Sequence, residues 1–464
     1  MLIQRAQLLD GTAVDIRVGV QIESVADSLA PNRGETVFDA AGGTVIPGLH
    51  DHHVHLRAAA AALDSVQVGP MVLHNRADLG RALAQAPVGI DGWIRAVGYH
   101  ESVAGPLDRW VLDELAESVP VRIQHRSGVL WFLNSAGLAA VGLPEHPDGR
   151  LRSYDTWSDA VARRDASLAA ISRRLLDFGV TGVTDATPGL RAEDIVTLSE
   201  EHRHGGLHQR VHWLAPGKRI LHDDSLDLDE LTDWIAGRHR DGGAVALHCV
   251  TVAQLVVSLA ALRAAGSHPG DRIEHAAVVP VEAIGELAAL GVLVVTQPNF
   301  VAERGDHYLA DVDPVDRPAL WRLRSLRAAG VRVALSTDLP FGGADPWAAM
   351  RAAVHRTTPT GAVLNTLECV SAAVALSLFT GHPDRPDLPR TVAPGQPGDL
   401  CVLAAAPAEV LDALDAGLVA ATVVNGHLFA RRNHPEVGSS RNAVLRYGSG
   451  SFGSPRTRSP TMLR

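Results

Sequence analysis

The stretch "DHHVH" contains two histidines in alternate positions, His53 and His55. If it continues the apolar run "VIPGL" as a strand, Asp51, His53 and His55 point to the same side. Both imidazoles can then bind one cation. His50 and His52 form a competing pair on the other side of that strand. The chain has 22 histidines, so a chance pairing in a polar loop is the alternative, but the preceding apolar run favours a metal site.

Three further metal-binding side chains also follow apolar runs. His248 lies near the end of "AVALHCV", and His275 ends "DRIEH", 27 residues later and about one strand–helix unit away. Asp338 follows "VRVALST" and is a candidate metal ligand and proton shuttle. Each alone has a structural alternative, a hydrogen-bonded histidine at a strand end or an N-cap aspartate. Their recurrence at equivalent places favours one shared site.

Lys218 is the single lysine among 42 basic residues of the Lys and Arg types. It closes the run "RVHWLAPGK", 30 residues before His248. A lysine amine that loses its proton can react with CO2 to give a carbamate, an anionic ligand whose two oxygens can bridge two metal ions. Arginine cannot, because its pKa is too high. The alternative is an ordinary surface lysine, and its place one unit before His248 favours the functional interpretation.

The elements that must hold these side chains alternate along the middle of the chain. Short β-rich runs are separated by helical patterns closed by glycine, which predicts parallel strands with crossover helices. Polar residues at the carboxyl ends of such strands are typical of a (β/α)8 barrel, here expected over 44–390. We expect 1–43 and 391–431 to form one small β domain together. The tail 432–464, rich in Ser, Gly, Pro and Arg, is expected to be disordered.

The composition excludes several classes of function. A net charge of −10 and 4% aromatic residues argue against nucleic acid as a partner, and no apolar run of membrane-spanning length is present. The three cysteines, Cys249, Cys369 and Cys401, are odd in number and far apart, which fits a reducing, cytoplasmic location. We expect a small-molecule substrate as the partner, and the sequence is compatible with a homo-oligomer.

In its order of HxH, Lys, His, His and Asp, the chain resembles the amidohydrolase superfamily. More narrowly, the blocks "GWIRAVGYHE", "VRIQHRSGVLWFLNSAGL", "GVTGVTDAT" and "DRIEHA" resemble the amidohydrolase-3 (YtcJ-like) group, and the resemblance covers about 1–430. It implies an α/β fold, a TIM-like (β/α)8 barrel with a small β-sandwich domain built from both termini. The group's pattern PG-x-x-D-x-H-x-H selects His53 and His55. The chain departs from the group at Val129, often histidine, and in a shorter stretch around Lys218, and both changes concern the substrate pocket.

The resemblance also implies the chemistry, hydrolysis of a non-peptide, amide-like C–N bond by metal-activated water. One or two divalent ions, zinc being expected, would be held by His53, His55, carboxylated Lys218, His248, His275 and Asp338. Asp338 would also orient the water and move its proton to the leaving nitrogen. Candidate substrate contacts are Tyr99, His125, Arg126 and Arg304, with strand-end packing as the alternative for the first three.

Two rival interpretations remain. A deaminase on the same barrel usually has a glutamate soon after the histidine of the fifth strand, here His248. The sequence from His248 onward is "HCVTVAQL", which contains no acid. Such deaminases also tend to lack a lysine at the position of Lys218. A non-catalytic scaffold or binding protein has no need to keep a complete ligand set.

Overall fold

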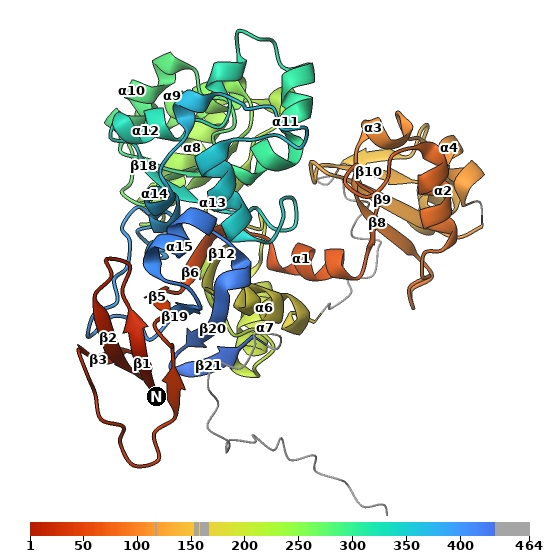
Figure 1. Ribbon diagram of the computed structural model, residues 1–464. Helices are drawn as coiled ribbons and strands as arrows, with labels where there is room; N and C mark the ends of the chain where they lie inside the picture. Colours follow the sequence, from red (N-terminus) through yellow and green to blue (C-terminus); the bar gives the residue numbers. More distant parts are fainter. Residues whose placement is uncertain (117, 153–156, 158–166, 432–464) are drawn as a thin grey trace, which may run out of the picture.

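The structure is a computed structural model, and it describes residues 1–116, 118–152, 157 and 167–431 of the 464. Within them the chain has a mixed α/β fold (Figure 1). The tail expected to be disordered, 432–464, lies outside the described residues. Among the described helices, none combines the length and apolar character that a membrane span requires.

Strands from both ends of the chain form one sheet. They are β1 (Leu2–Gln7), β2 (Ala13–Val18), β3 (Ile22–Ala26), β4 (Val37–Asp39), β5 (Thr44–Pro47), β19 (Leu400–Leu403), β20 (Val419–Val424) and β21 (His427–Ala430). The order is β21-β20-β19-β5-β1-β2-β3, with β4 paired to β1. The ends meet where β19 runs antiparallel to β5, with Cys401 opposite Ile46. Alternating apolar residues, among them Ile16 and Val402, form a core on this sheet.

Eight parallel strands lie in the main body of the described chain. They are β6 (Leu49–Val54), β12 (Val180–Asp185), β13 (Arg210–Trp213), β14 (Lys218–Ile220), β15 (Ala246–Cys249), β16 (Arg272–His275), β17 (Leu293–Thr296) and β18 (Arg332–Leu335). One sheet has the order β13-β12-β6, and another runs from β14 to β18 in chain order. A parallel bridge between Val54 and Leu339 links β6 to the segment after β18. In the described residues no strand pairing joins β13 to β14.

Helices cover the outside of these strands (Figure 1). Leu259 of α9 and Leu287 of α10 are buried in one large core with Leu247 and Ile273 of the strands. The helices are α1 (Leu56–Leu63), α6 (Ala169–Asp177), α7 (Ala192–Arg203), α8 (Leu228–Arg240), α9 (Val252–Ala265), α10 (Val281–Leu290), α11 (Asn299–Asp311), α12 (Arg324–Ala328), α13 (Pro346–His355), α14 (Ala372–Ser377) and α15 (Pro407–Ala413). Short 3-10 turns are η2 (Asp223–Ser225), η3 (Arg317–Ala319), η4 (Thr366–Glu368) and η5 (Ala416–Leu418).

A separate lobe is inserted between β6 and β12 (Figure 1). Its sheet has the order β11-β10-β9-β8-β7, and residues such as Ile94 and Ile123 form its own core. Its elements are β7 (Val66–Gln67), α2 (Arg76–Ala84), β8 (Ile94–Tyr99), α3 (Glu101–Ala104), α4 (Arg109–Leu115), β9 (Val121–His125), β10 (Leu130–Leu133), α5 (Ser135–Ala140) and β11 (Arg150–Arg152). The lobe lies within 44–390, the range expected to form the barrel.

Candidate metal centre

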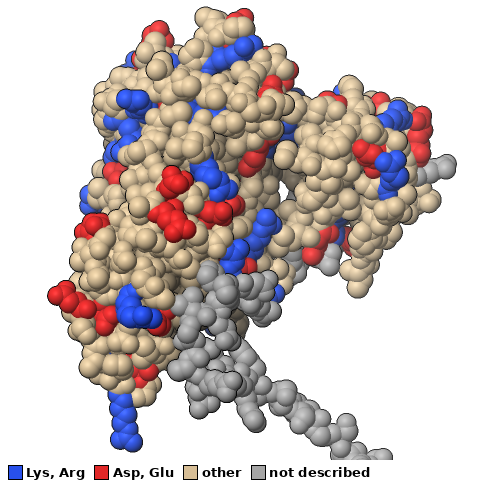
Figure 2. Space-filling view, viewed as in Figure 1, with Lys and Arg blue, Asp and Glu red and all other residues tan. Residues whose placement is uncertain are grey.

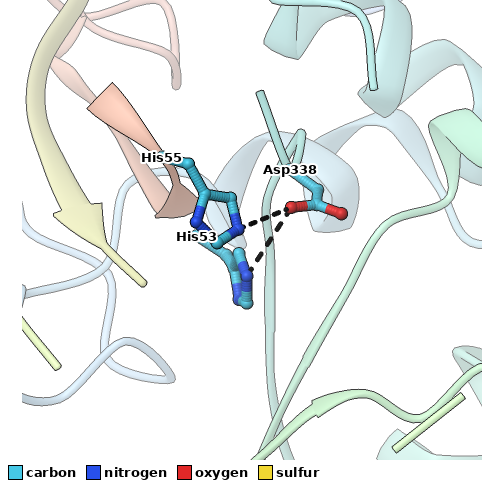
Figure 3. A group of neighbouring side chains, drawn as sticks. All are labelled: His53, His55 and Asp338. Atoms are coloured by element: carbon cyan, nitrogen blue, oxygen red, sulfur yellow. Dashed lines mark ion pairs between the residues drawn. The ribbon is translucent and has the colours of Figure 1, made fainter. Parts of the chain in front are cut away.

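Four imidazoles and one carboxylate meet at the carboxyl ends of the parallel strands. His53 Nε2 and His55 Nε2 lie 3.6 and 3.3 Å from Asp338 Oδ1 (Figure 3). The ring of His275 lies 4.8 Å from that of His53, and the ring of His248 lies 4.5 Å from that of His275, between centroids. Side chains from β6, β15, β16 and the turn after β18 therefore line one small volume, as the sequence pattern led us to expect.

Two of these residues have an unusual backbone. His275 has a φ of 70° and Asp338 a φ of 59°, in the left-handed region that residues with a side chain seldom adopt. Such conformations cost free energy and cluster at functional sites. The Asp338 N–H donates to the carbonyl of His53 at 3.0 Å, so the strained turn is tied directly to the histidine strand.

The buried carboxylate of Asp51 joins the histidine strand β6 to the turn that carries Asp338. Asp51 accepts hydrogen bonds from the Thr337 N–H at 3.0 Å and from its hydroxyl at 2.5 Å. Burial raises the pKa of Asp51 to about 7. Because Thr337 precedes Asp338 and Asp51 precedes His53 by two, this contact fixes the spacing of the metal-site residues.

Hydrogen-bond partners at Nδ1 orient the imidazoles of His53 and His275. His53 Nδ1 contacts Glu274 Oε2, and His275 Nδ1 lies 2.8 Å from Gln297 Oε1. An imidazole that donates its Nδ1–H has a lone pair on Nε2, the form a metal ligand requires. Arg272 Nε donates to Glu274 Oε1 at 2.6 Å. The sequence analysis missed Glu274 and Gln297, and its sole signal for Glu274 was its place directly before His275.

Lys218 occupies a different strand position from the one expected. The sequence analysis placed it at the end of a strand. The structure ends β13 at Trp213 and begins β14 with Lys218, because the chain turns between them, where the Gly217 N–H donates to Leu214 O. Lys218 Nζ is buried without a hydrogen-bond partner. Burial lowers the pKa of this amine to about 8, and its charge lowers those of His53 and His248.

The charges of the group suit a cation. Burial, followed by the charge of Lys218, lowers the pKa of His53 to about 3, and burial lowers those of His248 and His275, so these imidazoles are neutral near pH 7. Burial opposes ionisation of Asp338, but its contact with His55 Nε2 and electrostatic attraction to the neighbouring histidines outweigh this and lower its pKa to about 2. An anionic oxygen thus faces neutral nitrogens.

The spacing of these atoms fits a divalent ion. In a tetrahedral site with bonds of about 2 Å, neighbouring donor atoms lie about 3.3 Å apart, close to the two separations in Figure 3. Among the described buried atoms without a hydrogen-bond partner are His53 Nε2, Asp338 Oδ1 and Lys218 Nζ. Buried polar atoms are nearly always paired, so the free lone pairs of His53 Nε2 and Asp338 Oδ1, 3.6 Å apart, suit a shared positively charged partner.

The competing histidines lie elsewhere. His50 Nε2 is 2.9 Å from Thr184 Oγ1, and the ring of His52 stacks on that of His50 at 4.6 Å. Neither belongs to the described groups of possible ligands around Asp338.

The four candidate substrate contacts are divided between a core and a cleft. The ring of Tyr99 is fully buried in the lobe core, and its hydroxyl donates to Gly105 O at 2.5 Å. We therefore correct the expectation for Tyr99, which is a core residue. His125, Arg126 and Arg304 line a cleft of about 610 Å³ between the inserted lobe and the main body.

A second group of possible ligands, His100, Glu101 and His125, lies beside this cleft. His100 Nδ1 accepts the Ser102 N–H, and His125 Nδ1 accepts the Ser127 N–H. In a neutral imidazole the other nitrogen then carries the proton. His125 Nε2 accordingly donates to Glu101 at 3.2 Å, and the group is better suited to hydrogen bonding than to metal binding.

Comparison with known proteins agrees with this geometry. The model of the amidohydrolase family matches residues 36–430. The chain belongs to the amidohydrolase family. This confirms the resemblance noted in the sequence, and the protein is accordingly a hydrolase that acts on carbon–nitrogen bonds.

Individual relatives of this amidohydrolase are distant. It is 25% identical to the N-substituted formamide deformylase of Arthrobacter pascens, over 82% of this chain and 85% of that protein. It is similar in structure to uncharacterized metal-dependent hydrolases of Pyrococcus horikoshii OT3 and Pyrococcus furiosus. The TM-scores are 0.71 and 0.68, at 19% and 20% identity, and the alignments cover 89% and 88% of this chain and 98% and 99% of those chains. These two structures share its fold.

Proposed function

We propose that this amidohydrolase is a metal-dependent hydrolase that cleaves an amide-like C–N bond of a small molecule. The observation that carries the proposal is the pair of buried acceptor atoms without a hydrogen-bond partner, His53 Nε2 and Asp338 Oδ1, 3.6 Å apart. A divalent ion held there would polarise the acyl oxygen and lower the pKa of water toward 7.

The proposed ligands are those expected from the sequence. His53, His55, His248, His275 and Asp338 supply four nitrogens and an anionic oxygen, a set that suits zinc. Lys218 is proposed as the carbamate ligand. Its buried amine has a pKa of about 8, so its neutral, CO2-reactive form is accessible near neutral pH.

In the proposed reaction, one side chain of the site transfers the proton and others orient the metal-binding imidazoles. Asp338 has a pKa of about 2, so its carboxylate is ready to accept the proton of the attacking water and to pass it to the departing nitrogen. Glu274 holds the ring of His53 through Nδ1, and Gln297 holds that of His275. The strained backbone at His275 and Asp338 fixes both side chains before the substrate arrives.

The fold that we propose to hold this site is a TIM-like barrel. The parallel strands follow one another in barrel order within two sheets, and the bridge between Val54 and Leu339 joins the first strand to the segment after the last one. In such barrels chemistry occurs at the carboxyl ends of the strands, where these side chains meet.

The substrates that we propose are N-substituted formamides and related N-acyl amines, since a distant relative is a deformylase of N-substituted formamides. The rival deaminase would need an acid soon after His248, and residues 249–256 contain none. Glu274, the buried acid nearest in sequence to His275, is occupied by His53 and Arg272.

A substrate screen tests the proposal. Zinc-loaded protein is incubated with N-formyl and N-acyl amines, and the released amine is measured, with Asp338→Asn as the matched control. Hydrolysis by the wild type that is lost in the variant supports the proposal. Release of ammonia from amino-heterocycles without amide cleavage would favour the deaminase, and no turnover of either class would favour the scaffold.

A further inference from the structure

The cleft beside the metal centre is shared by the inserted lobe and the main body. Gln124 and Arg126 line it from the lobe, and Arg304 and Phe341 line it from the body. The ring of Phe341 packs edge-on against that of His55, 5.2 Å away between centroids. The cleft therefore lies one side chain away from His55, and the candidate metal ligands themselves are not among the residues that line it.

Of the three arginines that line this cleft, Arg174 is exposed, whereas Arg126 and Arg304 are partly buried and lie there without an acidic partner among the described residues. Arg126 Nη1 is 3.4 Å from His307 Nδ1, and Arg304 Nη2 donates to the carbonyls of Phe341 and Arg126. No described residue places a carboxylate oxygen within 4.0 Å of either guanidinium. Burial, followed by the charge of Arg304, lowers the pKa of Arg126 to about 10, so both groups are charged at neutral pH and repel each other.

The carboxylates of the neighbourhood already have other partners. Glu303 also lines the cleft, but it accepts hydrogen bonds from the Gly343 N–H at 2.9 Å and from Asn299 at 3.1 Å, and burial raises its pKa. Glu101 pairs with His125. The positive charge of the arginine pair is thus left for a ligand to neutralise.

The rest of the cleft is apolar. Leu63, Met71 and Val72 line its wall, and their exposed fractions of 43%, 72% and 58% leave apolar surface open to water. Together with Phe341, they offer a binding surface to a hydrocarbon or aromatic group. On the face of the molecule drawn in Figure 2, acidic and basic side chains are interspersed. The neighbouring guanidinium groups of Arg126 and Arg304, which have no acidic partner, differ from that mixed distribution.

We propose that the substrate of this site is an N-acyl amine that carries a carboxylate beside an apolar side chain, with Arg126 binding the carboxylate. A guanidinium matches a planar carboxylate with two parallel hydrogen bonds. The inference rests on the proposed hydrolase function and narrows its substrate class. The carboxylate takes no part in bond changes: water adds OH to the acyl carbon, the C–N bond breaks, and the nitrogen receives the proton.

A matched pair of substrates tests this inference. N-formylphenylalanine and N-formyl-2-phenylethylamine differ in the carboxylate alone. For the wild type we expect kcat/KM to be at least about tenfold higher for the carboxylate, the effect of one charge-assisted contact. Arg126→Gln should raise KM for N-formylphenylalanine by about tenfold and leave the neutral amide within about twofold. Arg126→Lys should restore part of that affinity.

Arg173→Gln is the control, since Arg173 is exposed on α6 and is not among the residues that line the cleft. It should change the kinetics of neither substrate. Equal kcat/KM values for the two amides in the wild type, or equal losses in the Arg126 and Arg173 variants, would overturn the inference.

A binding measurement separates this inference from the proposed function. Calorimetry with 3-phenylpropionate should show binding to the wild type and to Arg173→Gln, with at least about tenfold weaker binding to Arg126→Gln. If neither amide is hydrolysed, the hydrolase proposal fails, while this result still supports the carboxylate site. Equal affinity in all three proteins, or no binding to the wild type, would contradict it.

Discussion

His53 contacts the carboxylate of Glu274 through Nδ1 while its Nε2 faces Asp338. Glu274 is in turn held by Arg272, whose Nη2 also donates to the carbonyl of His52 at 2.8 Å. The buried Arg272–Glu274 pair of β16 therefore sets both the tautomer and the direction of the first histidine on β6. This arrangement is what presents a lone pair on His53 Nε2 to a metal ion.

The Glu274 contact predicts a loss of metal affinity on neutral substitution. Glu274→Gln should weaken metal binding by about 10- to 100-fold, as substitutions of such orienting groups do, and lower kcat in proportion to the bound metal. Competition with a chelator gives the affinity. Glu282→Gln, exposed on α10, is the control and should bind metal as the wild type does; an unchanged affinity in both would refute the orienting role.

Lys218 should be required for the full metal complement. Lys218→Ala removes the carbamate ligand, so metal content and activity should both fall, with partial rescue by short carboxylic acids that replace its oxygens. Lys218→Arg keeps a positive charge but cannot be carboxylated and should not be rescued. Metal content by mass spectrometry and turnover with and without acetate check this. Unchanged turnover in the alanine variant would remove the lysine from the mechanism.

Asp338→Asn separates proton transfer from metal binding. The amide retains an oxygen at the same place but cannot take a proton, so the variant should keep much of its metal and lose about 10²- to 10⁴-fold in kcat, the usual effect of a general acid–base. Metal content and kcat are measured on the same preparation. Full activity would exclude Asp338 as the proton shuttle.

A substitution at Gly128 tests whether the inserted lobe acts on the metal centre through Phe341. Its φ is 78°, and an added Cβ would lie 2.6 Å from the ring of Phe341, which packs on His55. Gly128→Ala should therefore displace Phe341 and lower kcat/KM as well as stability. Gly105→Ala is matched, with a φ of 77° but no atom within 4 Å, and should cost about 1 kcal/mol of backbone strain without changing kcat/KM. Equal kinetics in the two variants would contradict a role for Phe341.

Glu368 should make the stability of the fold dependent on pH. Burial raises its pKa, but hydrogen bonds from the Ser325 hydroxyl at 2.6 Å and from the Leu323 N–H at 2.9 Å outweigh this and lower it. A lowered folded pKa stabilises the protein above the unfolded pKa of about 4.3, and that stability is lost as the pH falls through the folded pKa. Glu368→Gln should be less stable by about 2 kcal/mol at pH 7.

Urea unfolding of Glu368→Gln and the wild type at pH 7 and at acidic pH measures this difference. The gap between the two proteins should shrink as the pH falls below about 4. A gap that is independent of pH would show that the ionised form of Glu368 does not supply the stability.

Some features of the site follow from the sequence because they depend on spacing alone. Strand alternation separates His53 and His55 from His50 and His52, and the repeat of strand–helix units brings His248 and His275 to one edge. The strand-rich character of both chain ends led us to expect one small β domain from 1–43 and 391–431. The sheet also includes β5 (Thr44–Pro47), which lies in the range expected to form the barrel.

Other features needed three-dimensional contacts. The strands β7, β8 and β9 of the inserted lobe have the apolar pattern of barrel strands, so local sequence does not show that they form another sheet. Lys218 begins a strand of three residues after a turn, too short for a periodic signal. The partners of Glu274 and Gln297 depend on register between strands, and Tyr99 faces the lobe core because of packing that its neighbours in sequence do not reveal.

The measurement that bears most directly on the account is anomalous diffraction at the zinc edge from crystals grown with zinc and bicarbonate. We predict a peak about 2 Å from His53 Nε2 and His55 Nε2, with added density on Lys218 Nζ for the carbamate. The account would be contradicted by an unmodified lysine and no anomalous peak among these side chains.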